Sequence, residues 1–237
     1  MPPLQWPVMR NCYSKCFPRI PRHIVTAPDD KHSAAAPGGA AASATADESH
    51  LVETLVDRET LFHGRFLEAR RDTVRLPNGH TSTREYVVHP GAVVVIPLLD
   101  DGRRVLVERQ YRYPVGRVMI EFPAGKLDPG EDPYDCGRRE LLEETGYRGG
   151  EWAYAGALHL AIAYSTEIIH IYFARNLQAG AAELDPDEFL DVHPMAVEDL
   201  YEACRDGRVT DAKTLTCTLW LQNVLSGAWP LTWKKNE

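Results

Sequence analysis

Three things are scarce in this sequence of 237 residues: paired cysteines, long apolar runs and positive charge. No apolar stretch approaches the roughly 18 residues that a membrane-spanning helix needs, so no membrane association is expected. The net charge of −8 argues against a general nucleic-acid binder, because such proteins depend on cationic contacts to phosphate. The five cysteines form no disulfide-like framework, so the reducing cytoplasm is the expected location.

Acidic residues are absent from the first 27 positions, which carry several basic side chains. Residues 33–49 then read SAAAPGGAAASATADES, a composition typical of a flexible linker. Residues 1–50 are therefore predicted to be a disordered or low-complexity extension. A transit peptide and a start codon assigned too far upstream are the alternatives.

The rest of the chain predicts an α+β fold. Asn78-Gly79 marks a hairpin turn, so residues 51–88 are expected to form an antiparallel β subdomain with a return strand at 81–88. Residues 93–99 are continuously apolar, which indicates a strand buried on both faces. The other expected strands are 119–122, 151–160 and 167–174, and the expected late helices are 196–207 and one that follows a cap at Thr210 or Asp211.

The most informative stretch, residues 125–147, reads GKLDPGEDPYDCGRRELLEETGY. Asp132 suits a helix N-cap, Pro133 the first helical position and Gly146 the C-terminal stop, which predicts a helix over 133–145.

Glu140, Glu143 and Glu144 would share one edge of this helix. Carboxylates crowded so closely repel one another, and core packing does not call for them. A divalent cation would relieve the repulsion, and Mg2+ in particular is usually held by a few carboxylates together with substrate phosphates. The pattern therefore predicts a Mg2+ site, with Mn2+ as the other candidate. A solvated acidic helix is the alternative reading.

Together these residues resemble the Nudix box. The fixed positions of the box are occupied by Gly125, Glu131, Arg139, Glu140, Leu141, Glu143, Glu144, Gly146 and Tyr147. The resemblance implies a Nudix hydrolase domain over residues 89–230, built as an α/β/α sandwich with a mixed sheet. It also implies an enzyme that hydrolyses a nucleoside diphosphate joined to a further group.

The resemblance assigns roles residue by residue. The metal ligands would be Glu140, Glu144 and the carbonyl of Ala124, with Glu143 joining through water. Arg139 would orient the glutamates through a charge-assisted pair. Glu167, outside the box, is the expected general base, and a plain surface acid at a strand edge is its alternative.

Segments outside the box narrow the substrate. TREYVVHPGAVVVIPL, VERQYRYPVGR and EFPAGKLDPGE resemble ADP-ribose pyrophosphatases, a likeness that spans about residues 51–225. By that resemblance Arg112 would bind a substrate phosphate and Glu121 would contact the ribose region. Arg84 would reach the substrate from the subdomain at 51–88 of a partner chain, in a homodimer. Salt bridges are the alternative role for both arginines. Phe66 could stack on adenine, although core packing is favoured for it.

One loop departs from that branch of the family. Its members commonly carry a Ser-Pro-Gly-aromatic run here, whereas this chain reads Ala161-Ile162-Ala163-Tyr164. The expected activity is Mg2+-dependent hydrolysis of ADP-ribose, or a related ADP-sugar, to AMP and ribose 5-phosphate. GDP-mannose or another nucleotide sugar stays open as the substrate, and a non-catalytic nucleotide-sugar sensor is the alternative of another class. The acidic residues 185–188 are expected to be solvated surface.

Overall fold

The computed structural model describes residues 47–99 and 102–235, so nearly all of the predicted extension at 1–50 lies outside the described part. Described residues begin with a short 3-10 helix, η1 (Ser49–Leu51). None of the helices in this part is long and apolar enough to cross a membrane.

The first three strands form an antiparallel sheet of their own, in the order β1 (Thr54–His63), β2 (Glu68–Arg75) and β3 (Thr81–Val88). The predicted turn joins β2 to β3: the side chain of Asn78 accepts a hydrogen bond from the His80 N–H at 3.1 Å, and Gly79 has a φ of 85°. β1 is exposed along its whole length. These three strands therefore form a hairpin-linked sheet with little core of its own.

The second sheet has eight strands and is mixed. Its strands are β4 (Ala92–Leu99), β5 (Arg104–Arg112), β6 (Arg117–Glu121), β7 (Ala124–Lys126), β8 (Glu151–Leu158), β9 (Ile169–Arg175), β10 (Leu190–Ala196) and β11 (Lys234–Lys235). The main order is β10-β5-β4-β9-β8-β11, with β6 paired to β5 and β7 paired to β4. β4 and β9 run parallel, whereas the other pairs are antiparallel.

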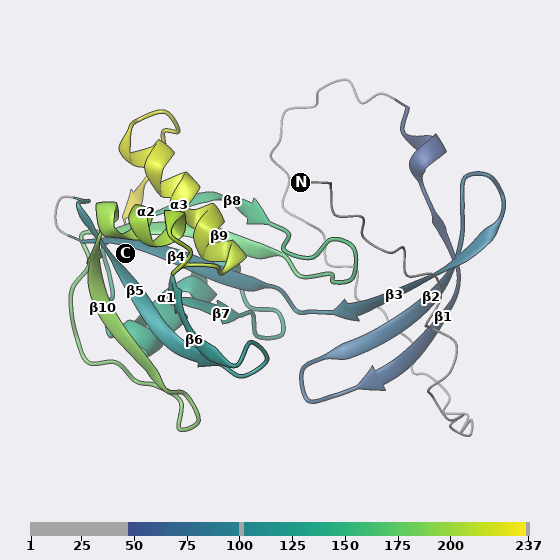
Figure 1. Cartoon of the computed structure of the whole chain (residues 1–237), viewed down its shortest axis with the longest axis horizontal. Helices are drawn as coiled ribbons and strands as arrows, with labels where there is room; N and C mark the ends of the chain where they lie inside the picture. The colour runs from purple at the N-terminus through teal and green to yellow at the C-terminus, as the bar shows by residue number, and fades with distance from the viewer. Residues whose placement is uncertain (1–46, 100–101, 236–237) are drawn as a thin grey trace, which may run out of the picture. The chain divides into compact units, whose positions relative to one another are not determined.

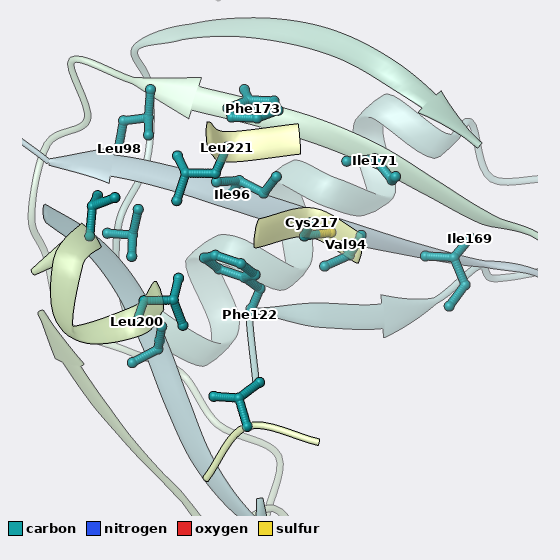
Figure 2. Close-up of a cluster of buried hydrophobic side chains, with 14 of the residues drawn as sticks. Val94, Ile96, Leu98, Phe122, Ile169, Ile171, Phe173, Leu200, Cys217 and Leu221 are labelled. Atoms are coloured by element: carbon teal, nitrogen blue, oxygen red, sulfur yellow. The ribbon is translucent and has the colours of Figure 1, made fainter. Parts of the chain in front are cut away.

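Helices cover both faces of this sheet because β4 is apolar on both sides. Val94 and Ile96 belong to one buried cluster, which includes residues of α2 (Val197–Arg205) and α3 (Ala212–Leu225). Figure 2 shows Leu200 of α2 and Leu221 of α3 in this cluster. Val93 and Val95 belong to the other cluster, with residues of α1 (Pro133–Thr145). Figure 1 shows α2 and α3 gathered over one side of the large sheet.

The α+β prediction, with a mixed sheet between helical layers, is confirmed. The helix expected at 133–145 has those bounds. The strand expected at 167–174 begins two residues later, at Ile169, so Glu167 lies on the preceding loop. β10 was not predicted. Its sequence, LDVHPMA, contains a proline and sits at the edge of the sheet, where a missing N–H is tolerated.

Candidate active site

The residues that cap the two ends of α1 fix the position of the glutamates. The Asp132 side chain accepts a hydrogen bond from the Tyr134 N–H at 2.8 Å and so caps the helix. At the other end Gly146 adopts a left-handed conformation, with a φ of 73°, and its N–H donates to the Leu142 carbonyl. Both ends match the sequence prediction.

Arg139 organises the acidic edge of α1. Its Nη1 atom donates to Glu140 Oε1 at 2.9 Å and to Glu143 Oε2 at 3.1 Å. Its Nε and Nη2 atoms donate to the two carboxylate oxygens of Glu131, at 2.8 and 2.9 Å. The hydrogen bond from Arg139 lowers the pKa of Glu131 to about 2. Arg139 therefore joins the loop before the helix to the glutamates on it, as the sequence suggested.

Glu140 is partly buried and Glu144 is almost wholly buried. Burial raises the pKa of Glu140, against the opposing effect of Arg139. Glu144 is 4% exposed, and its Oε2 accepts a hydrogen bond from the Ala124 N–H at 3.1 Å. Burial raises the pKa of Glu144, and the nearby charge of Glu108 raises it further.

Glu108 was missed by the sequence reasoning. It is 3% exposed, and burial raises its pKa. Its Oε1 atom has no hydrogen-bond partner among the described residues. An acidic residue inside the apolar run of β5 was the available signal. On the pairing of β5 with β6, Glu108 also stands opposite Glu121, an arrangement that neighbouring strands normally avoid.

Arg112 and Glu121, predicted as separate substrate contacts, bind each other. The Nε and Nη2 atoms of Arg112 donate to the two carboxylate oxygens of Glu121 at 2.7 and 2.9 Å. The buried Lys213 also contacts Glu121, and its Nζ donates to Asp211 Oδ2 at 2.9 Å. Burial alone would raise the pKa of Glu121, but Arg112 and Lys213 hold it below its ordinary value.

One cleft of about 920 Å3 brings most of the predicted residues together. Its lining includes Arg112, Glu121, Ala124, Arg139, Glu140, Glu143, Glu144 and Glu167. Asp185, Asp187 and Glu188 also line it, so this acidic segment belongs to the cleft and is not merely surface.

Two predicted contacts differ from the rest. Arg84 does not line the cleft of its own chain. It binds Glu53 in a salt bridge and donates to the Thr83 carbonyl at 2.9 Å. The prediction that Phe66 packs in the core is wrong, because the residue is 54% exposed and lines the cleft. Lys126 Nζ lies 4.6 Å from its ring centroid.

Among residues 47–99 and 102–235, no three Asp, Glu, His or Cys side chains converge as a metal site. Arg139 donates to Glu140 Oε1, and the Ala124 N–H donates to Glu144 Oε2.

Comparisons with known proteins agree with the geometry. Residues 88–216 match the NUDIX domain, and residues 53–87 match the nucleoside diphosphate sugar hydrolase N-terminal domain. The chain is 40% identical over 172 residues to the methanol dehydrogenase activator of Bacillus methanolicus, covering 72% of this chain and 92% of that protein. It is 38% identical over 174 residues to the ADP-ribose pyrophosphatase of Bacillus subtilis (strain 168), covering 73% and 94%.

A solved structure supports the fold. The crystal structure of an ADP compounds hydrolase superposes with a TM-score of 0.67 and 23% sequence identity, covering 74% of this chain and 95% of the other. The chain therefore belongs to the NUDIX family. Within it, this protein is a hydrolase of the pyrophosphatase type, so the sensor alternative is not supported.

Proposed function

We propose that this enzyme hydrolyses the pyrophosphate bond of ADP-ribose, or of a closely related ADP-sugar. The products from ADP-ribose are AMP and ribose 5-phosphate. The observation that carries the proposal is a single cleft lined by the glutamate edge of α1 and by Arg112. The similarity to an ADP-ribose pyrophosphatase that spans nearly all of that relative gives independent support.

The buried carboxylates of the cleft fit a hard divalent cation. Glu108 has an unpartnered buried oxygen, and burial disfavours the charged forms of Glu140 and Glu144 until a cation compensates. Glu140, Glu144 and the carbonyl of Ala124 would hold Mg2+, with Glu143 acting through water. Mn2+ takes the same oxygen ligands and is the alternative. When bound, the cation supplies Lewis-acid polarisation of a phosphoryl oxygen.

Glu167 is assigned to accept the proton of the attacking water. It lines the same cleft as the glutamates of α1 but comes from the loop before β9, so it approaches from a different element. A general base must lie within hydrogen-bond reach of the water it activates, and Glu167 is assigned this role because it lines the cleft from a separate element. Arg139 acts indirectly by holding Glu140 and Glu143.

Arg112 is assigned to a substrate phosphate, in an orientation set by Glu121. The two bonds to Glu121 use Nε and one hydrogen of Nη2. Nη1 and the second hydrogen of Nη2 then stay available for phosphate oxygens, which suit the planar guanidinium. Glu121 thus orients Arg112, and its predicted contact with the ribose region stays a prediction.

Phe66 and Lys126 are assigned to the nucleotide end of the substrate. The exposed ring of Phe66 offers an apolar surface on the cleft, suited to stacking against adenine. A Phe66→Leu variant keeps apolar bulk but removes the ring face. We expect it to raise KM for ADP-ribose about tenfold, because a stacked base contributes on the order of 1–3 kcal/mol.

A substrate panel tests the assignment. Purified enzyme is assayed with ADP-ribose, ADP-glucose and GDP-mannose, each with Mg2+ and with Mn2+, and kcat/KM is compared. ADP-ribose should give the highest value. A higher kcat/KM for GDP-mannose would overturn the substrate proposal while leaving the reaction class intact.

A further inference from the structure

The loop that carries Glu167 has little packing of its own. It joins β8 to β9, and its side chains Ile162 and Tyr164 are 84% and 64% exposed. Proline, which could stiffen such a loop by fixing φ, is absent from positions 161–164. Something else must therefore hold the Glu167 carboxylate in place.

Main-chain hydrogen bonds connect the end of β3 to this loop. The Val87 N–H donates to the Tyr164 carbonyl at 2.9 Å, and the Thr166 N–H donates to the Val87 carbonyl at 3.0 Å. One residue pair further on, the His89 N–H donates to the Thr166 hydroxyl at 2.9 Å. The N-terminal sheet thus continues into the loop of the assigned base.

The ring of His89 lies near the Glu167 carboxylate and has a defined tautomer. The Gly91 N–H donates to His89 Nδ1 at 3.1 Å, so Nδ1 accepts and the neutral ring carries its hydrogen on Nε2. Nε2 lies 3.6 Å from Glu167 Oε1, and the His89 side chain is only 12% exposed. On the loop itself, the Glu167 N–H donates to the Ser165 hydroxyl at 3.1 Å.

We propose that His89 is a positioning residue: its Nε2–H, oriented by Gly91, fixes the Glu167 carboxylate in the cleft. The proposal rests on the proposed role of Glu167 in hydrolysis. The 3.6 Å separation is longer than a hydrogen bond, and the proposal requires it to shorten to one when substrate is bound. The N-terminal sheet then serves catalysis as well as any role in assembly.

Two isosteric variants separate the two ring nitrogens. His89→Asn keeps an acceptor for the Gly91 N–H but has no donor at the ε position. His89→Gln keeps an amide donor near the ε position. We expect His89→Asn to lower kcat about tenfold with KM within about twofold, a smaller loss than the ~100-fold or more from removing the base itself. His89→Gln should recover most of the rate.

A double variant and a second site guard against a purely structural effect. Added to Glu167→Gln, His89→Asn should cause no further loss of kcat, because the carboxylate that His89 positions is already gone. Thr166→Val leaves the ring intact but removes the hydroxyl that accepts from the His89 N–H. It should also lower kcat without raising KM.

Three results would overturn the inference: a wild-type kcat in His89→Asn, an equal loss in His89→Gln, or an additive loss on the Glu167→Gln background. Should the His89 variants not fold, an unchanged kcat in Thr166→Val would overturn it. Failure of the proposed function is distinct, because the unmodified enzyme would then hydrolyse no nucleotide sugar at all.

Discussion

The carboxylate of Glu140 lies directly against the α carbon of Gly125. A β carbon added at Gly125 would sit 1.8 Å from the Glu140 carboxyl carbon and 1.9 Å from its Oε1. The φ of Gly125 is not in the left-handed region, so glycine is required there for space and not for backbone conformation. The tight fit ties the loop that offers the Ala124 carbonyl to a predicted metal ligand on α1.

Gly125→Ala should therefore impair the cation site by displacing Glu140. We expect kcat to fall about 100-fold or more, as it does when a group that stabilises the transition state is misplaced by about an ångström. Mn2+ affinity, followed by electron paramagnetic resonance of the free ion, should fall in parallel.

A double-variant cycle checks the cause. If the clash with Glu140 is responsible, Gly125→Ala should cost little more on a Glu140→Ala background, because the opposing carboxylate is absent. A full additional loss in the double variant would mean that the alanine acts on something other than Glu140.

The Arg112–Glu121–Lys213 group predicts a stability effect. Glu121→Gln removes the charge that pairs with the buried Lys213 and the partly exposed Arg112, and loss of one partner from a buried ion pair costs at most roughly 3–5 kcal/mol. Urea unfolding measures this. Glu53→Gln, which breaks the exposed pair with Arg84, is the matched control and should cost less than about 1 kcal/mol. A raised KM with unchanged unfolding would instead assign Glu121 directly to the substrate.

The buried glutamates predict a metal-dependent pH profile of stability. Burial raises the pKa of Glu108, Glu140 and Glu144 above the ordinary value of 4.5, so without metal the folded state binds more protons than the unfolded state. Their stabilising contribution is complete below that value and is lost as pH rises through the folded pKa. The Tm of metal-free enzyme should therefore fall from pH 6 to pH 9.

Mg2+ should remove much of that decline, because it binds the deprotonated carboxylates and releases their protons. The pKa values of Glu121 and Glu131 are lowered, so they titrate below this window and do not obscure the effect. The slope of Tm against pH is measured by scanning calorimetry with and without Mg2+. Equal slopes would contradict the assignment of Glu140 and Glu144 to the cation.

Arg84 predicts complementation between chains, since it lies outside the cleft of its own chain. We propose that residues 51–88 mediate a homodimer in which Arg84 serves the partner's site. The fully exposed β1 offers a surface for this. Co-expressed Arg84→Ala and Glu144→Gln chains would then form one intact site per mixed dimer, and activity should exceed that of either variant alone. No gain, or a monomer in sedimentation at micromolar concentration, would count against it.

The parts of the site that follow from local rules were predictable from the sequence. The bounds of α1, its Asp132 cap and the pairing of Arg139 with the glutamates all depend on residues within a few turns of one another. The hairpin depends on a short turn at Asn78 and Gly79, in which the Gly79 N–H donates to the Leu76 carbonyl. Such features are set by spacing alone.

The parts that were missed depend on contacts far apart in the chain. Lys213 reaches Glu121 across 92 residues, and His89 donates to Thr166 across 77. Neither spacing carries a local signal. Glu108 could have been suspected as a charge within an apolar run, but only the pairing of β5 with β6 places it opposite Glu121. Phe66 was assigned to the core because aromatic residues usually are, and only the cleft gives it another role.

The central claim is that the glutamates of α1 and a divalent cation together cleave ADP-ribose. The most direct measurement is AMP release from ADP-ribose by unmodified enzyme and by Glu144→Gln, with Mg2+ and after its removal by a chelator. The account predicts rapid release only for the unmodified enzyme with Mg2+, with Glu144→Gln folded and slower by about 100-fold or more. Equal rates for both proteins, or release that survives removal of the cation, would contradict it.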